Sequence, residues 1–344
     1  MTKTELKKGE QAEERLRLYF LNLGYFVVRS INAEFQGYDV TDIDLFLYSR
    51  PSPISRERTN VDVKMKQRPQ ALERIFWTKG LKEVLGLEKC IVATTDKRSH
   101  VGEFGAINDV LVLDGNFMNK LDSTERYTDD RLNEEGFLNI LSESVLSNGD
   151  GEWKKDYERS KSNLINKLNY DGLNEILNKI RVYMEQLGSG HVSEPCYRIL
   201  YSSISFFLVT LDYSIKDVSY KDQKDRVNLI SEGIRFGEKG RQKSEEVVAM
   251  STALVTSFMS RDEFDTEAIK NEVYSQFMDI SADDISSYFG SAKMLQRLLP
   301  IAIEIESFAF NKQFFYPSSM SSEIQSVIGL LCDFYSFDRK SVLL

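Results

Sequence analysis

The pattern of apolar and polar residues in the first third of the chain predicts one helix followed by three strands. Between Leu6 and Leu23 apolar residues recur with helical spacing, and Gly24 follows as a stop signal. Three short runs rich in β-branched and aromatic residues come next, at 25–31, 42–48 and 60–66. The stretches between these runs are polar and turn-like, including the sequence RPSPISRERTN.

The next segments predict a second helix and two more strands. Residues 70–87 return to a helical period through Leu72, Ile75, Phe76, Val84 and Leu85. The run 89–95 is almost wholly apolar, as is typical of a strand buried on both faces, and 110–115 resembles a fifth strand. The order α-β-β-β-α-β, followed by a short connection and a further strand, predicts an α/β sandwich with a mixed central sheet.

Strand signals stop after about residue 122, and the rest of the chain is expected to be helical. Residues 123–152 form a polar connection with at most a short helix, and a helical stripe from Leu164 to Leu187 breaks near Asp171–Gly172. Ser193 and Pro195 are placed to open a helix. Further helices are expected at 195–214, 239–260, 266–279, 282–299 and 321–337. We therefore expect an α/β domain at 1–122 and an all-helical domain at 123–344, without the repeats of a regular solenoid.

Two strongly apolar stripes of the helical part are most simply explained as core, although part of them is also suited to a dimer or partner interface. The first stripe comprises Ile199, Phe206, Phe207, Leu208 and Leu211. The second comprises Val247, Val248, Met250, Leu254 and Phe258.

Composition indicates an ordinary globular protein, with 42% hydrophobic and 28% charged residues. No apolar run is long enough to span a bilayer, and no apolar segment follows the basic N-terminal residues, so we expect a cytoplasmic protein with no membrane contact. The three cysteines are far apart, which favours reduced thiols. With two histidines in the chain, a histidine-rich metal site is excluded, and any catalytic metal must have oxygen ligands, as Mg²⁺ or Mn²⁺ prefers.

The formal net charge of −9 is unevenly distributed along the chain. Residues 1–122 carry 19 Lys+Arg against 18 Asp+Glu, whereas residues 123–344 carry 25 against 35. Because binding to nucleic acid draws on Lys and Arg, any DNA is expected to bind mainly at the first domain.

Acidic residues on two predicted strands suggest a site for a divalent cation. Asp62 and Lys64 are two apart, so they project from one face of their strand, but this pair alone is more often a solvated strand face. Asp42 and Asp44 lie at the start of the preceding strand, which is otherwise apolar, and a buried carboxylate there is costly unless it is paired or binds a cation. Adjacent strands would bring Asp44 close to Asp62, where a divalent cation compensates their repulsion.

This arrangement resembles the PD-(D/E)xK superfamily of restriction-endonuclease-like nucleases, most nearly its Mrr-like and Holliday-junction-resolvase-like branches. The resemblance covers residues 6 to about 115 and rests on GEQAEERLRLYFLNLGY, TDIDLFLY and NVDVKMK, followed by the helix and strand of ALERIFWTKGLKEVLGLEKCIVATT. Ile43 stands where the family often has proline, and Asp62 where glutamate is more frequent.

The resemblance implies site residues and a metal-dependent reaction. Asp44 and Asp62, with the main-chain carbonyl of Val63, would bind Mg²⁺ or Mn²⁺, and Lys64 would orient the attacking water or stabilise negative charge. The first helix of the family carries a glutamate, which places Glu13 in that role, with Glu14 or Glu10 as alternatives. Asp42 remains an alternative to Asp44, since both lie on one face of the strand.

A basic, partly aromatic stretch after the third strand is suited to phosphate contacts, although each residue alone also fits a solvated helix surface. It contains Lys66, Gln67, Arg68, Arg74, Trp77 and Lys79. Lys66 and Gln67 are the best placed for this role, and Trp77 is otherwise expected to pack on the sheet.

These features predict a Mg²⁺-dependent endonuclease acting on DNA. By analogy, a nuclease joined to a helical module suggests an effector of a bacterial restriction or anti-phage defence system, with the helices forming a homo-oligomer or binding a protein partner. One alternative is a catalytically silent scaffold or interaction subunit that keeps the nuclease fold. The other is a pure interaction protein, in which Asp44 and Asp62 do not meet.

Overall fold

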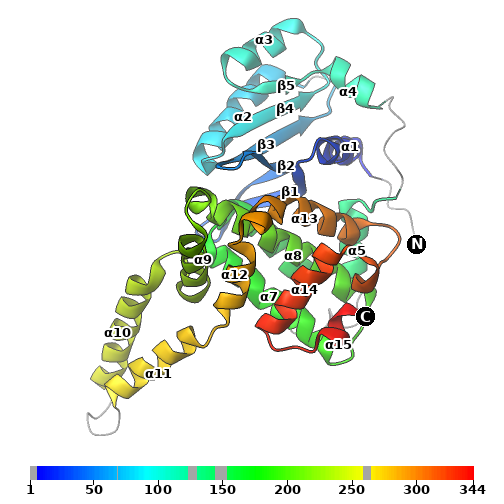
Figure 1. Ribbon diagram of the computed structural model, residues 1–344. Helices are drawn as coiled ribbons and strands as arrows, with labels where there is room; N and C mark the ends of the chain where they lie inside the picture. The colour runs from blue at the N-terminus through cyan, green and yellow to red at the C-terminus, as the bar shows by residue number, and fades with distance from the viewer. Residues whose placement is uncertain (1–5, 68, 123–129, 144–152, 259–264) are drawn as a thin grey trace.

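The N-terminal part of the chain folds around a five-stranded mixed sheet (Figure 1). The computed structural model describes residues 6–67, 69–122, 130–143, 153–258 and 265–344. The strands are β1 Phe26–Phe35, β2 Tyr38–Ser52, β3 Ser55–Lys64, β4 Lys89–Thr94 and β5 Leu111–Leu113, adjacent in that order. β2 pairs antiparallel with both β1 and β3, whereas β3, β4 and β5 run parallel. The mixed sheet expected from the sequence is therefore confirmed.

Four helices accompany this sheet: α1 Lys8–Asn22, α2 Ala71–Leu85, α3 Ser99–Ile107 and α4 Gly115–Asp122. The expected short connection before the last strand was wrong, because α3 lies there. The strand expected at 110–115 shrinks to β5, since α4 begins at Gly115, where an added side chain would collide with the main chain of Thr95.

The two faces of the sheet are covered by different elements. On one face α1 and α4 pack over a core that includes Leu16, Val61 and Val63. On the other face α2 and α3 cover β3 to β5, while Phe46 of β2 belongs to the core of the helical region. Phe46 pairs with Asn60 of β3, and the Asn60 side chain donates to the main-chain carbonyl of Thr78 in α2. The helical region and α2 therefore share this second face.

Helix α2 contacts the sheet through a narrower stripe than its sequence predicted. Ile75 is buried, but Leu72, Phe76 and Val84 are 36%, 62% and 80% exposed, so the expected apolar face is wrong at these positions. Phe76 instead meets Phe104 of α3 edge-on, with ring centroids 5.3 Å apart.

The polar stretch between the second and third strands is also more ordered than expected. β2 and β3 continue through it as a long hairpin that turns at 53–54. Its arginines Arg50 and Arg56 both bind Asp212, which is buried in the helical region. Because Asp212, far away in the sequence, binds both arginines, this polar stretch can form strands.

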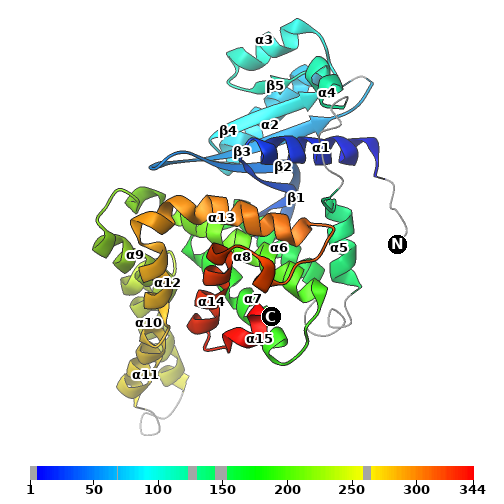
Figure 2. The same ribbon diagram turned by 45° about the vertical axis from the view of Figure 1, so that its right-hand side comes forward.

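Eleven α-helices follow in the described residues beyond the sheet (Figure 2). They are α5 Glu134–Ser142, α6 Trp153–Asn166, α7 Tyr170–Gly188, α8 Glu194–Ser214, α9 Gln223–Phe236, α10 Gly240–Phe258, α11 Thr266–Met278, α12 Ala282–Phe289, α13 Ala292–Phe310, α14 Ser322–Phe334 and α15 Arg339–Leu343. The expected helical region is confirmed, and α8 is buried along most of its length, so its stripe is core as predicted. No helix among the described residues is long and apolar enough to cross a membrane.

Three expectations for this region need correction. Residues 282–299 are not one helix, because α12 ends at Phe289 and Ser291 caps α13, its hydroxyl accepting from the Met294 N–H at 3.3 Å. Helix α9 was not expected. The stripe on α10 is not core: Met250 is 75% and Leu254 60% exposed. Arg68, residues 259–260 and most of the 123–152 connection lie outside the described residues.

A buried ionic network joins the sheet to the helices. Arg17 of α1 is 1% exposed and donates to Glu134 of α5 at 3.1 Å and to Glu306 of α13 at 3.0 Å. Arg29 of β1 likewise binds Glu14 and Glu135. Because buried charges need partners, these contacts fix α1 and β1 against the helical region.

Candidate functional site

Asp44 and Asp62 lie beside each other on neighbouring strands. Leu45 of β2 pairs with Val61 of β3, so continuing this register by one residue sets Asp44 opposite Asp62. Directly opposed residues of antiparallel strands have Cα atoms about 4.5–5.5 Å apart. The Asp44 carboxylate takes the place of a ladder carbonyl here, since its Oδ2 accepts from the Val63 N–H at 2.6 Å.

The Asp44 carboxyl is unusually hard to ionise. Burial is the main reason that its pKa rises from an ordinary 3.8 to about 6, and the negative charges of Asp62 and Glu13 add to the rise. The Val63 N–H and the Lys64 ammonium partly offset this by stabilising the carboxylate. The structure therefore brings Asp44, Asp62 and Lys64 within electrostatic range of one another.

Asp62 is bound by two cationic side chains. Arg74 of α2 donates two hydrogen bonds to it, from Nε to Oδ2 at 2.9 Å and from a terminal nitrogen to Oδ1. Lys64 Nζ lies 3.8 Å from Oδ1. The Asp62 carboxylate is thus neutralised within the protein, unlike that of Asp44.

Asp44, Asp62 and the Val63 carbonyl fit a divalent cation if Arg74 releases at least one of its two hydrogen bonds to Asp62. Two carboxylates and a main-chain carbonyl are hard oxygen ligands of the kind that Mg²⁺ prefers. Burial raises the pKa of Asp44 although the Val63 N–H and the Lys64 ammonium partly stabilise its negative charge, so a cation would stabilise that charge further. Within the described residues no group of three or more His, Cys, Asp or Glu side chains is arranged as a metal site, so such a cation would rest on this pair and the main chain.

Glu13 lies near this site but is held by another partner. Its Oε2 accepts from Arg29 Nε at 2.7 Å, and its charge still raises the pKa of Asp44. Of the alternatives, Glu14 is buried in the same arginine network and Glu10 caps the start of α1 by accepting from the Lys7 N–H.

Asp42 does not lie beside Asp62 in the structure. It is exposed, pairs in register with Asn32 of β1, and lines a polar hollow of about 1070 Å³ together with residues of α5 and α6. Of the two acidic residues that the sequence left open, Asp44 is the one beside Asp62.

Lys66 and Gln67 line a polar hollow of about 490 Å³ near the end of β3. Lys8, Gln11 and Arg15 of α1 line its other side. These three were not singled out from the sequence, although their i, i+3, i+7 spacing is a signal that they share one helix face.

Trp77 and Lys79 lie away from this hollow. Trp77 is 50% exposed and does not pack on the sheet as the alternative interpretation expected; its ring centroid is 5.7 Å from the Arg74 guanidinium. Lys79 lies near the thiol of Cys90, whose pKa is raised mainly by burial and lowered slightly by this charge. Cys90 is at the opposite end of β4 from Thr94, the partner of Lys64.

Comparisons of this chain with protein-family models, with curated proteins and with solved structures found no match.

Proposed function

We propose that the protein is a Mg²⁺- or Mn²⁺-dependent nuclease of the PD-(D/E)xK type, acting on phosphodiester bonds of DNA. The observation that carries this proposal is the pairing of Asp44 with Asp62 and Lys64 across β2 and β3. These residue types on two consecutive strands are the ones that the resemblance to restriction-endonuclease-like nucleases implies for the catalytic centre.

The residues would divide the work according to their chemistry. Asp44, Asp62 and the Val63 carbonyl would hold the cation, which when bound supplies a Lewis acid and lowers the pKa of water. Lys64 would orient the nucleophile or stabilise the charge that develops on the phosphate. Ionised Asp44 is required for this role, so metal binding should strengthen as pH rises through about 6.

Substrate contacts are best supplied by the hollow near the end of β3, which Lys66 and Gln67 line. Lys66, Lys8 and Arg15 bring positive charge to it, and Gln67 adds amide donors. Arg15 also pairs with Asp122 at the rim, so its charge is partly compensated. The helical region, with its excess of acidic residues, is the less suitable side for DNA.

The ion pair between Arg74 and Asp62 favours a second candidate function, that of a catalytically silent scaffold. If that ion pair is permanent, the arginine supplies the charge that a metal would supply, and the domain is a silent scaffold. Its two charge-assisted hydrogen bonds to one carboxylate have the geometry of a strong structural pair.

Cleavage assays on the full-length protein would separate the two functions. Plasmid, linear, branched and single-stranded DNA are incubated with Mg²⁺, Mn²⁺ or EDTA. We expect metal-dependent cleavage by the wild type and by Asp42→Asn, and none by Asp44→Asn or Lys64→Ala. Equal cleavage by all four proteins would remove the proposed site.

Thermal unfolding with and without Mn²⁺ gives a readout that needs no substrate. A ligand that binds the native state raises its unfolding temperature. The nuclease proposal expects a rise for the wild type that Asp44→Asn abolishes, whereas the scaffold predicts no rise in either protein.

A further inference from the structure

Helices α10 and α11 form an arm that leaves the helical body beside α9 (Figures 1 and 2). Their main contacts are with each other and with α9. Helix α11 has no buried residue, and Thr252 is the one buried side chain among those described on α10. The arm therefore lacks a core of its own along most of its length.

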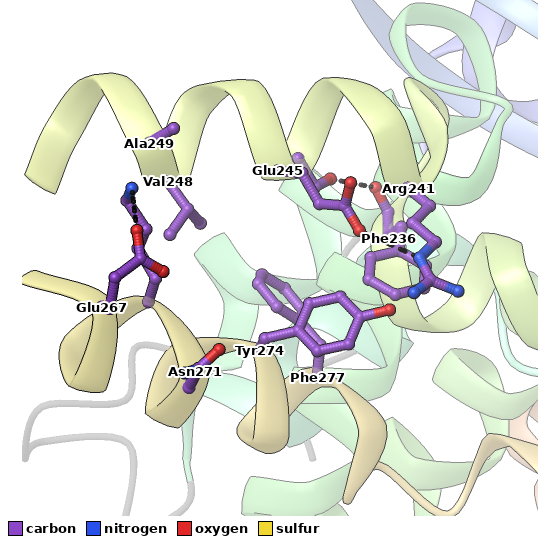
Figure 3. A pocket seen from close by; sticks show the side chains of 11 residues that line it. Phe236, Arg241, Glu245, Val248, Ala249, Glu267, Asn271, Tyr274 and Phe277 are labelled. Carbon is purple, nitrogen blue, oxygen red and sulfur yellow. Dashed lines mark hydrogen bonds and ion pairs between the residues drawn. The ribbon is translucent and has the colours of Figure 1, made fainter.

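The inner side of the arm is the hollow between its two helices, of about 360 Å³ (Figure 3). Val248 and Ala249 of α10 face it from one side, and Asn271 and Tyr274 of α11 from the other. Val247, Met250 and Leu254 of α10 do not line this hollow. They lie on another face of the helix.

That outer face carries a continuous apolar stripe. Val247, Met250 and Leu254 are 57%, 75% and 60% exposed and are spaced i, i+3, i+7. The sequence from Val247 to Phe258 contains no charged residue. An exposed apolar stripe of this kind on a projecting helix is typical of a surface that another helix covers.

We infer that this stripe binds α10 of a second copy of the chain, antiparallel and about a two-fold axis next to Met250. A two-fold interface brings one surface against itself, so that surface must be self-complementary. With the axis between residues 250 and 251, Val247 meets Leu254 of the partner subunit. Apolar side chains thus meet apolar side chains along the stripe.

The charges of α10 select the antiparallel orientation. Lys243 and Glu246 lie in its first turns and form an ion pair at 2.5 Å, whereas its second half is uncharged. Antiparallel packing sets this charged end against the uncharged end of the partner helix. Parallel packing would set Glu246 against its own copy and cost free energy through like-charge repulsion.

The net charge of the helical region disfavours a dimer that forms through the rest of that region. Residues 123–344 carry 25 basic against 35 acidic residues, so two bodies repel each other. Contact through the stripe instead joins Val247, Met250 and Leu254, which carry no charge. This inference rests on neither the metal site nor catalysis.

Sedimentation velocity on the full-length protein at micromolar concentration tests the interface. We expect a dimer for the wild type and a monomer for the double variant Met250→Glu, Leu254→Glu. The matched control is Ile107→Glu on α3, an apolar side chain that is 83% exposed and should leave the dimer intact. A monomeric wild type, which would leave the stripe to a different protein, overturns the inference, as does a dimer that survives the double variant.

Disulfide trapping tests the orientation without disturbing the apolar stripe by charge. Cys90, Cys196 and Cys332 are all buried, so a new surface cysteine reacts alone. Met250→Cys should form a covalent dimer under mild oxidation, because its copy lies across the axis. Lys243→Cys should not, because two copies would be about 20 Å apart along antiparallel helices at 1.5 Å per residue. Efficient trapping through Lys243→Cys, or none through Met250→Cys, would contradict the antiparallel dimer.

Discussion

Arg74 on α2 holds both carboxylate oxygens of Asp62 on β3. The same oxygens are the ones that a divalent cation would need, so arginine and metal compete for Asp62. Lys64, which is 3.8 Å from the same carboxylate, remains as a second positive charge when Arg74 is removed. The competition can therefore be measured by replacing Arg74 alone.

Arg74→Gln is expected to strengthen Mn²⁺ binding by roughly tenfold, since freeing one ion-paired carboxylate is worth on the order of 1.4 kcal/mol at a partly exposed site. Isothermal titration of Mn²⁺ into the full-length protein measures this. Arg58→Gln, which removes an arginine of β3 that pairs with Glu88, serves as the control and should leave the affinity unchanged. Equal affinity in wild type and Arg74→Gln would show that Asp62 is not a ligand.

Asp44→Asn is expected to stabilise the protein at neutral pH. The raised pKa means that folded Asp44 binds its proton more tightly than the unfolded chain does, so stability falls as pH rises from 3.8 to about 6 and stays lower above. The neutral asparagine avoids this loss, and we expect a gain of about 1–3 kcal/mol at pH 8 that shrinks towards pH 4.

Urea unfolding of wild type and Asp44→Asn from pH 4 to 8 measures that difference. Asp42→Asn is the matched control, because Asp42 is exposed and should show no such pH dependence. A destabilised Asp44→Asn at pH 8 would mean that the bond from Val63 outweighs the desolvation of the charge. Saturating Mg²⁺ should reduce the gain by stabilising the ionised wild type.

Arg17→Met is expected to destabilise the protein by about 3–5 kcal/mol, because it leaves Glu134 and Glu306 buried with one cation fewer. Arg15→Met, two residues earlier on the same helix, removes a 41% exposed arginine paired with Asp122 and should cost less than about 1 kcal/mol. Urea unfolding compares the two variants. Similar small losses in both would show that the buried network does not join sheet and helices energetically.

The succession of strands along the chain was predictable from sequence because β-branched and aromatic runs mark strands locally. The extension of the β2–β3 hairpin was not, because Arg56 finds its partner Asp212 across 156 residues. Periodicity likewise shows that one face of α10 is apolar, as at Met250, but not whether another element covers it. Periodicity alone therefore could not distinguish Ile199, which is buried in the core, from Met250, which is exposed.

The candidate site was predictable as far as the strands determine it. Asp62 and Lys64 share a face by strand geometry, and the pairing of β2 with β3 brings Asp44 beside them. Arg74 was recognised as a basic residue, but its contact with Asp62 depends on where α2 crosses β3. Lys8 and Arg15 were missed because they precede the motif by some fifty residues and meet Lys66 through the packing of α1.

Lys66 and Lys79 were both assigned to phosphate binding from sequence, and their positions now predict different effects. Lys66 lines the hollow near the end of β3, whereas Lys79 lies near Cys90 at the other end of β4. Each phosphate contact that is lost should reduce the salt dependence of DNA binding by about one counterion. We therefore expect Lys66→Ala to weaken binding to a short DNA duplex and to lower the salt slope by about one, with Lys79→Ala close to wild type. Fluorescence anisotropy across a salt series, in Ca²⁺ to prevent cleavage, measures both. A larger loss in Lys79→Ala would move the DNA path from the hollow to the outer surface of α2.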